Sequence, residues 1–293
     1  MKKILVLFCA VFIVSRLFAV TGASSFLREG IGADAVAMGG AGTAGTRGVN
    51  SIYWNPAGLT RMGAYGWQAG SMYTAKSYDR YYGYAAIARH SEDYGDFGVS
   101  LITYGTNDIE IFDDTGQSTG SGSDCEFVGG ISYANMVNYR FRYGVTMKGH
   151  YHDLLTYKAT GYSMDAGVIF QPLLDREVYI GLMLQNILGQ LFWNDYSEDM
   201  LSIYRIGAAV GIFEDIVRLS LDVVKEEALE DVIFRAGAEF RIMEYLFIRA
   251  GMDEEYPTAG AGIKYDAYKF DYAYTYDRQG LGDTHQFSLV LMW

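Results

Sequence analysis

Residues 66–293 are built of short segments in which apolar residues occupy every second position. Side chains on one face of a β-strand recur with a period of two, whereas those on one face of a helix recur every three to four residues, so this pattern predicts strands. About 14 such segments follow one another, most of them close to the roughly 9 to 11 residues that a tilted strand needs to cross a membrane. The chain is therefore expected to be all-β, either a soluble sandwich or a membrane barrel.

The two faces of these segments differ in polarity. In residues 231–243, the apolar Phe234 and Phe240 alternate with Arg235 and Glu239. An Arg or Lys that faces lipid at mid-depth costs roughly 2 to 4 kcal/mol, so a membrane barrel would direct its charged faces into the lumen. On this basis the predicted lumen-facing polar residues are Arg142, Lys148, Arg205, Arg218, Asp222, Arg235, Glu239, Arg241 and Arg249.

Residues 1–23 have the layout of a secretory signal peptide. Lys2 and Lys3 precede an apolar run over residues 4–14, and small residues follow around Ala19 and Ala23. Cleavage is expected after residue 19 or after residue 23. The apolar run is well short of the roughly 20 residues of a membrane-spanning helix, so we expect export rather than anchoring in the inner membrane.

Aromatic residues and connection lengths favour the barrel over the sandwich. Tyr and Phe crowd the segment ends, as at Tyr81, Tyr82 and residues 268–276, which is typical of the aromatic girdles of outer-membrane barrels. If both termini lie in the periplasm, the outward connections include the two longest, residues 106–124 and 187–201, and the inward ones are short turns. The prediction is that residues 66–293 form an antiparallel transmembrane β-barrel of about 14 strands, an even number that closes without exposed edges.

The charge balance excludes nucleic acid as a partner. The 23 Lys and Arg against 35 Asp and Glu give a net charge of -12 and a pI near 4.7, which leaves no basic surface of the kind that binds phosphates. Half of the residues are hydrophobic, yet the mean hydropathy is only +0.03, as expected when lipid-facing and polar positions alternate. Removal of the signal peptide would remove Cys9 and leave Cys125 as the only thiol, so no intramolecular disulfide is expected.

No catalytic or cofactor motif stands out. Residues 40–45 fit GxGxxG, but no strand precedes them and no acidic residue follows about 20 positions later, as a dinucleotide site requires. GxSxG is absent, and residues 113–124 lack the ligands of a calcium loop. None of the histidines has the spacing of metal ligands on a helix, and lumen polarity explains the two that share a strand face, His150 and His152. We expect no enzyme activity, no cofactor and no bound metal.

Residues 22–59 differ from the rest of the chain because they are rich in small residues; they contain GIGADAVAMGGAGTAG and then IYWNPAGL. This stretch resembles the amino-terminal region of the FadL/TodX outer-membrane transporters and, more closely, that of the PorV/PorQ-type barrels. Residues 280–293, GLGDTHQFSLVLMW, are similar to the last hairpin of the second group. The resemblance implies that residues 24–65 fold into the lumen of the barrel as a hatch, and it assigns Asn55, Pro56, Ala57 and Gly58 to its gating part.

The resemblance also implies a function. In FadL-type members, hydrophobic molecules such as long-chain fatty acids enter from the cell surface, bind near the hatch and leave through a lateral opening in the wall. This implies a protein of the outer membrane of a diderm bacterium, in contact with outer-membrane lipid, that takes up hydrophobic small molecules. Two alternatives stay open: a PorV-like barrel with secretion-system proteins as partners, and a hatch that is only a static plug.

Overall fold

The computed structural model describes residues 29–63, 65–77, 79–227, 231–276 and 282–293. Within them the chain forms one antiparallel sheet of 15 strands. The strands are β1 (Trp67–Ala75), β2 (Arg80–Arg89), β3 (Asp96–Phe112), β4 (Ser118–Asn138), β5 (Phe141–Leu154), β6 (Tyr157–Phe170), β7 (Val178–Phe192), β8 (Ser197–Asp199), β9 (Ile203–Ile212), β10 (Val217–Glu226), β11 (Val232–Met243), β12 (Leu246–Asp253), β13 (Tyr256–Tyr265), β14 (Tyr268–Thr275) and β15 (Thr284–Met292).

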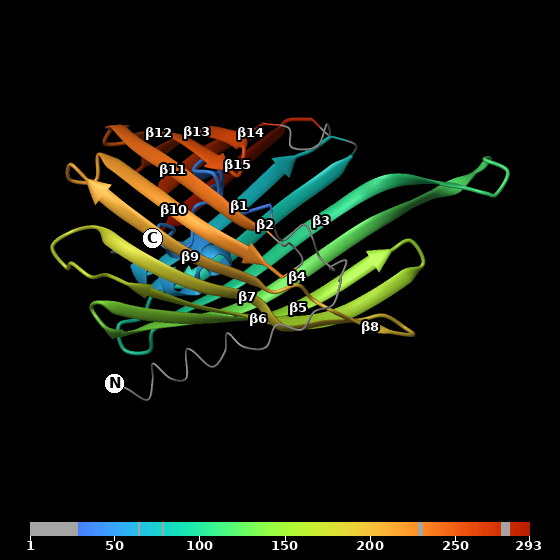
Figure 1. Cartoon of the computed structure of the whole chain (residues 1–293), viewed down its shortest axis with the longest axis horizontal. Helices are drawn as coiled ribbons and strands as arrows, with labels where there is room; N and C mark the ends of the chain where they lie inside the picture. The colour runs from blue at the N-terminus through green and yellow to red at the C-terminus, as the bar shows by residue number, and fades with distance from the viewer. Residues whose placement is uncertain (1–28, 64, 78, 228–230, 277–281) are drawn as a thin grey trace.

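The sheet closes into a barrel (Figure 1). β1 pairs with β15, and β6 pairs with β7, so the order of the strands has no free end. The three-residue β8 pairs only with the end of β7, and the other 14 strands form the wall, as predicted. At the closure, the backbone amides and carbonyls of Trp67 and Trp293 exchange hydrogen bonds of 2.9 and 3.0 Å. Closure satisfies the backbone groups that an edge strand would leave exposed.

The alternation of side chains along the strands matches the two faces of the predicted barrel. On β11, Arg235 and Glu239 are buried inside the barrel, whereas Phe234 and Phe240 are exposed on its outer surface. Met147 on β5 is likewise an exposed outward side chain, next to the buried Lys148. An apolar outer surface of this extent is unfavourable in water and is what a lipid environment requires.

The outer surface yields a prediction about the membrane. Leu221 lies outward in the middle of β10, and we expect Leu221→Arg to lower the free energy of unfolding in lipid bilayers by about 2–4 kcal/mol, because a guanidinium would face hydrocarbon. The matched control is Ile216→Arg in the turn before β10, where the cost should fall to about 0–1 kcal/mol. Denaturant unfolding of the protein refolded into vesicles measures both values. Equal costs at the two positions would contradict a lipid-facing β10.

Two predicted loops are wrong, because strands continue through them. β3 runs to Phe112 and β4 begins at Ser118, so most of residues 106–124 forms a hairpin that projects beyond the rest of the wall (Figure 1). Residues 187–201 likewise contain the end of β7 and the short β8. Beyond the barrel a strand has no lipid-facing side, so its sequence does not need to alternate. The small residues 118–123 pair there without such a pattern.

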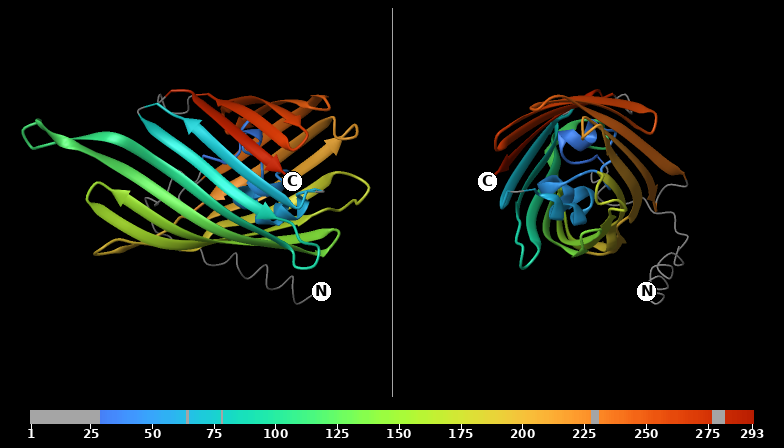
Figure 2. Two further views of the ribbon diagram at one scale, coloured as in Figure 1. Left: turned by 180° about the vertical axis from the view of Figure 1, so that it is seen from behind. Right: turned by 90° about the vertical axis from the view of Figure 1, so that its left-hand side faces the viewer.

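A lumenal segment, residues 29–63, lies inside the barrel (Figure 2). It contains α2 (Ala33–Val36), the 3₁₀ turn η3 (Gly48–Asn50), α3 (Ser51–Trp54) and the 3₁₀ turn η4 (Pro56–Arg61). α2 contacts β13 to β15, and η4 contacts β3 to β6, so the segment reaches from one side of the wall to the other. Residues 1–28, which include the predicted signal peptide, lie outside the described residues. Among the described residues, no helix is long and apolar enough to cross a membrane.

Candidate functional site

The predicted gating residues Asn55, Pro56, Ala57 and Gly58 form a turn that is buried against the wall; we call it the NPAG turn. The Asn55 carboxamide caps η4, because its Oδ1 accepts the N–H of Ala57 at 3.2 Å. Its Nδ2 lies 3.1 Å from the carbonyl of Val168 and 3.2 Å from that of Leu182, which are cross-strand partners on β6 and β7. Asn55 therefore joins the lumenal segment to two strands of the wall.

Glycines in the wall make room for this turn. A Cβ atom at Gly144 of β5 would lie 2.5 Å from the carbonyl carbon of Pro56, and one at Gly167 of β6 would collide with Asn55. Real Cβ atoms do not approach other heavy atoms so closely, so only glycine permits this contact without displacement of the turn. The local sequence of β5 and β6 is thus matched to the NPAG turn.

Replacing Asn55 should loosen the turn without affecting the barrel. We expect Asn55→Ala to increase amide hydrogen exchange at Ala57 and Gly58 by about fivefold or more, because a lost cap alone costs about 1 kcal/mol. Thr60→Ala is the matched control, since the hydroxyl of Thr60 donates its hydrogen bond within η4, to the carbonyl of Ala57. Mass-spectrometric exchange of refolded protein measures both variants. Unchanged exchange in Asn55→Ala would mean that Asn55 does not anchor the turn.

A network of charged side chains connects the opposite side of the lumenal segment to the wall. Arg249 donates to Glu239 at 2.6 Å and to Asp271 at 2.7 Å, and it is 1% exposed. Lys269 bridges Asp271, at 3.2 Å, and Asp34 of the lumenal segment, at 2.5 Å. These pairs account for how the inward charges of β11, β12 and β14 are tolerated, because buried charges are stable only when paired.

The contact between Asp34 and Lys269 depends on pH. Burial raises the pKa of Asp34, but the positive charges of Lys269 and then Arg249 outweigh burial, so the net pKa lies below its ordinary value. A lowered carboxyl pKa means that the contact stabilises the folded state above the ordinary pKa of about 4 and that this contribution is lost as the pH falls further. The link is therefore intact at neutral pH.

The other predicted lumen residues also lie in polar contacts, and one of them, Arg218, joins the network of Arg249 through Glu239. Asp222 accepts the N–H and the hydroxyl of Thr43, at 2.9 and 2.6 Å, and so holds the lumenal segment to β10. The remaining contacts are Arg235 with Asp253 at 2.7 Å, Lys148 with Asp165 at 2.7 Å, Arg205 with Gln185 at 3.1 Å, Arg142 with Gln171 at 3.3 Å, Arg218 with Glu239 at 3.2 Å, and Arg241 with the carbonyl of Glu214 at 2.7 Å.

Sequence reasoning missed the wall residues that complete these pairs. Lys269 and Asp271 alternate with the outward Phe270 and Tyr272 on β14, so the same rule of period two could have identified them. Asp34 and Thr43 could not have been found in this way. They lie in a segment without strand periodicity, and only the fold brings them to Lys269 and Asp222.

A cavity of about 440 Å³ lies between the lumenal segment and the wall. It is on the side of the barrel where the termini of the wall, Trp67 and Trp293, and the short turns are located, and Val290 and Met292 of β15 contribute to its lining. Its acidic lining residues are Asp34, Asp215, Glu239 and Glu244, and its cationic ones are Arg47, Arg61, Arg218, Arg241, Arg249, Lys264 and Lys269. The cavity is thus polar, with an excess of positive charge.

An apolar cluster covers the other side of the lumenal segment. Met72, Tyr82, Tyr84, Ile102 and Val128 point inward from β1 to β4 and are at most 5% exposed. They pack with Ile31, Tyr53 and Trp54 of the lumenal segment and with Met200, which follows β8. The segment therefore packs on this apolar cluster toward the end that carries the β3–β4 hairpin, which is the predicted extracellular end. Toward the termini it lines the charged cavity and packs on a second apolar cluster, which includes Leu59, Met62 and Met292.

Comparison with known proteins identifies this architecture. No protein-family profile and no curated protein matches the sequence. Among solved structures, the toluene transporter TbuX of Ralstonia pickettii covers 91% of this chain and 98% of its own, with a TM-score of 0.66 and 16% identity. The chain has the fold of this transporter. The toluene transporter TodX of Pseudomonas putida has a TM-score of 0.66 at 13% identity, covering 89% of this chain and 96% of its own.

A third neighbour extends the likeness to the FadL type. A FadL homologue of Pseudomonas aeruginosa covers 85% of this chain and 95% of its own, with a TM-score of 0.53 and 10% identity. At such identities the likeness concerns the fold, and it supports the predicted FadL/TodX-type architecture. The closer likeness to PorV/PorQ-type barrels stays a prediction from the sequence.

Proposed function

We propose that the protein is an outer-membrane channel that takes up hydrophobic small molecules, such as long-chain fatty acids or monoaromatic hydrocarbons. The observation that carries this proposal is the apolar cluster on the inner wall. A lumen filled with water would be lined by polar side chains, whereas Met72, Tyr82, Tyr84 and Ile102 form an apolar surface. Tyr53 and Trp54 of the lumenal segment cover this surface, and an apolar solute that takes their place there loses its contact with water. The names of the structural neighbours, toluene transporters and a FadL homologue, agree with a ligand of this class.

In this proposal the lumenal segment is the hatch. It separates the apolar cluster from the charged cavity, and it contacts the wall through the NPAG turn, Thr43 and Asp34. Two further ion pairs, Glu29 with Lys76 and Arg61 with Glu177, and hydrogen bonds to Ser288 and Thr258 also hold the segment, each contact being worth about 0.5–3 kcal/mol. A ligand that displaces Trp54 or Tyr53 from the cluster shifts the segment only if its binding offsets the contacts that break.

Ligand binding tests the proposal. Refolded protein in detergent should bind radiolabelled oleate or toluene saturably, with a dissociation constant in the micromolar range or below, which corresponds to about 8 kcal/mol. Ile102→Gln places a polar group in the apolar cluster and should weaken binding severalfold, whereas Ile131→Gln, on the outer surface, should not. Absence of saturable binding of both ligands would contradict the proposed function.

A further inference from the structure

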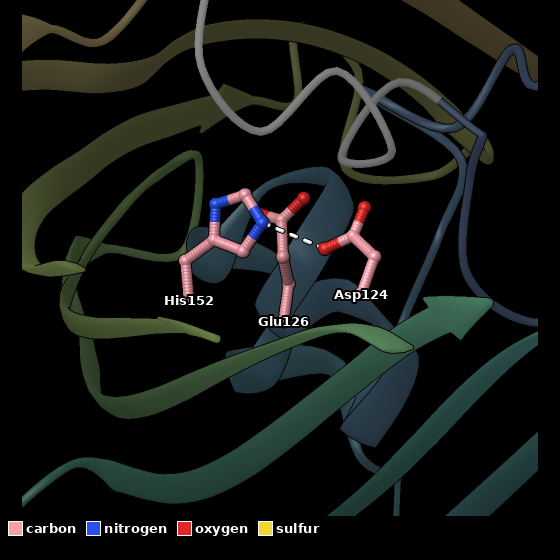
Figure 3. A group of neighbouring side chains, drawn as sticks. All are labelled: Asp124, Glu126 and His152. Carbon is pink, nitrogen blue, oxygen red and sulfur yellow. Dashed lines mark hydrogen bonds and ion pairs between the residues drawn. The ribbon is translucent and has the colours of Figure 1, made fainter. Parts of the chain in front are cut away.

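Two carboxylates and an imidazole meet on the inner face of β4 and β5, at some distance from the NPAG turn (Figure 3). Glu126 and His152 are cross-strand partners, and Asp124 lies two residues before Glu126 on the same face of β4. His152 Nε2 lies 2.7 Å from Asp124 Oδ1, and one ligand atom from each of the three residues falls within 4.8 Å of the others. In Figure 3 the three side chains project from the sheet in the same direction.

The surroundings restrict these side chains. Glu126 is 8% exposed, and the side chain of His152 is 13% exposed. The ring of Trp193, which follows β7, packs edge-on against the imidazole with 5.2 Å between the ring centroids, and Tyr196 stacks on Trp193 in turn. Donor atoms on paired strands with packed side chains are pre-positioned, which lowers the entropic cost of binding an ion.

We propose that Asp124, Glu126 and His152 bind one divalent transition-metal ion of the zinc type. One nitrogen and two oxygen donors form a set that suits Zn²⁺, whereas Ca²⁺ and Mg²⁺ take oxygen ligands almost exclusively. Zinc needs donor distances of roughly 2.0–2.2 Å, so small rotations of the three side chains would replace the contact between His152 and Asp124 by bonds to the ion. Three protein ligands leave a fourth position for water from the lumen.

This site is independent of the proposed transport function, because none of its residues belongs to the apolar cluster, the NPAG turn or the charged cavity. It lies toward the end of the wall where β5 ends at Leu154 and the β3–β4 hairpin continues, the predicted extracellular end. From the sequence, lumen polarity was sufficient to explain His152. The structure shows that donor atoms of Asp124 and Glu126 lie within 4.8 Å of the His152 imidazole nitrogen.

Metal titration of the refolded full barrel tests the site. The protein lacks residues 1–23, which include Cys9, carries no polyhistidine tag, is treated with a chelator, and contains Cys125→Ser, so that no thiol can bind the probe. Calorimetry with Zn²⁺ should give one ion per barrel, and Co²⁺ should give the visible absorption bands of four-coordinate cobalt. Asp124→Asn, Glu126→Gln and His152→Gln should each weaken binding by about tenfold or more, since loss even of outer partners of a metal site has effects of this size.

The controls are a carboxylate and an imidazole outside the cluster. Asp153→Asn changes an outward residue next to His152, and His285→Gln changes an exposed histidine on β15; both should leave the affinity unchanged. Heat-modifiable migration in detergent gels verifies that each variant is folded. Absence of both saturable Zn²⁺ binding and the Co²⁺ bands in the Cys125→Ser protein would overturn the proposal whatever the variants do. Equal weakening by the control substitutions would also overturn it.

Discussion

A disulfide between the lumenal segment and β9 should stop uptake, and its reduction should restore it. Gly45→Cys and Ala209→Cys place the two thiols suitably, because a Cβ atom at residue 45 would lie 3.5 Å from Cβ of Ala209 and disulfides require roughly 3.5–4.5 Å. The hydroxyl of Ser220, 2.9 Å from the same Cβ position, has to turn away. If the segment must move for a ligand to pass, oxidation should lower the uptake rate by roughly tenfold or more.

The design contains its own controls. Cys125→Ser removes the native thiol, each single cysteine variant should transport under oxidising conditions, and a reducing agent should reverse the effect in the double variant. Liposomes loaded with a fatty-acid-binding protein provide the measurement, as uptake of radiolabelled oleate. Uptake that is equal in the oxidised and the reduced protein would mean that residues 29–63 are a static plug and that the ligand passes around them.

Replacing Arg249 should strongly destabilise the barrel. Arg249→Met leaves the buried Glu239 and Asp271 without their shared partner, and breaking a buried ion pair costs about 3–5 kcal/mol. We expect about 3 kcal/mol, the lower end of this range, because Arg218 and Lys269 still contact the two carboxylates. The free energy of unfolding in lipid vesicles, from denaturant titration, measures the effect.

A charge-balanced double variant separates the charge effect from the loss of packing. Combining Arg249→Met with Asp271→Asn removes one positive and one negative charge, while Glu239 keeps Arg218 at 3.2 Å and Lys269 keeps Asp34 at 2.5 Å, so most of the lost stability should return. If the single variant is as stable as the unchanged protein, the side chains are solvated rather than paired. If the double variant is as unstable as the single one, packing rather than charge determines the result.

The period of two separates the polar face of each strand from its apolar face. Arg235 and Phe234 are neighbours in the sequence and lie on opposite faces of β11. Their polarity accounts for this orientation, because an Arg that faces lipid is costly whereas a Phe is not. The same rule placed Lys148 inside and Met147 outside on β5. In a membrane barrel the environment on each side of the wall is set by the lipid, so alternation alone determines the orientation of each strand.

Contacts between the lumenal segment and the wall could not be predicted in this way. Asp34 and Lys269 are separated by most of the chain, and only closure of the barrel around the segment brings them to 2.5 Å. The hydrogen bonds from Asn55 to carbonyls of β6 and β7 require that the glycines of β5 and β6 lie directly against the NPAG turn. The local sequence cannot indicate this arrangement. The extension of β3 and β4 beyond the wall was missed because strands outside the lipid carry no such alternation.

The central claim is that the interior passes hydrophobic solutes and not water-soluble ones. Its most direct test is uptake into liposomes that contain the refolded barrel, with radiolabelled oleate and toluene compared with glucose, whose mass lies between those of the two. The account predicts saturable uptake of at least one hydrophobic solute above the rate of protein-free liposomes, lowered by Ile102→Gln, and no uptake of glucose. Entry of glucose with no added uptake of either hydrophobic solute would contradict it.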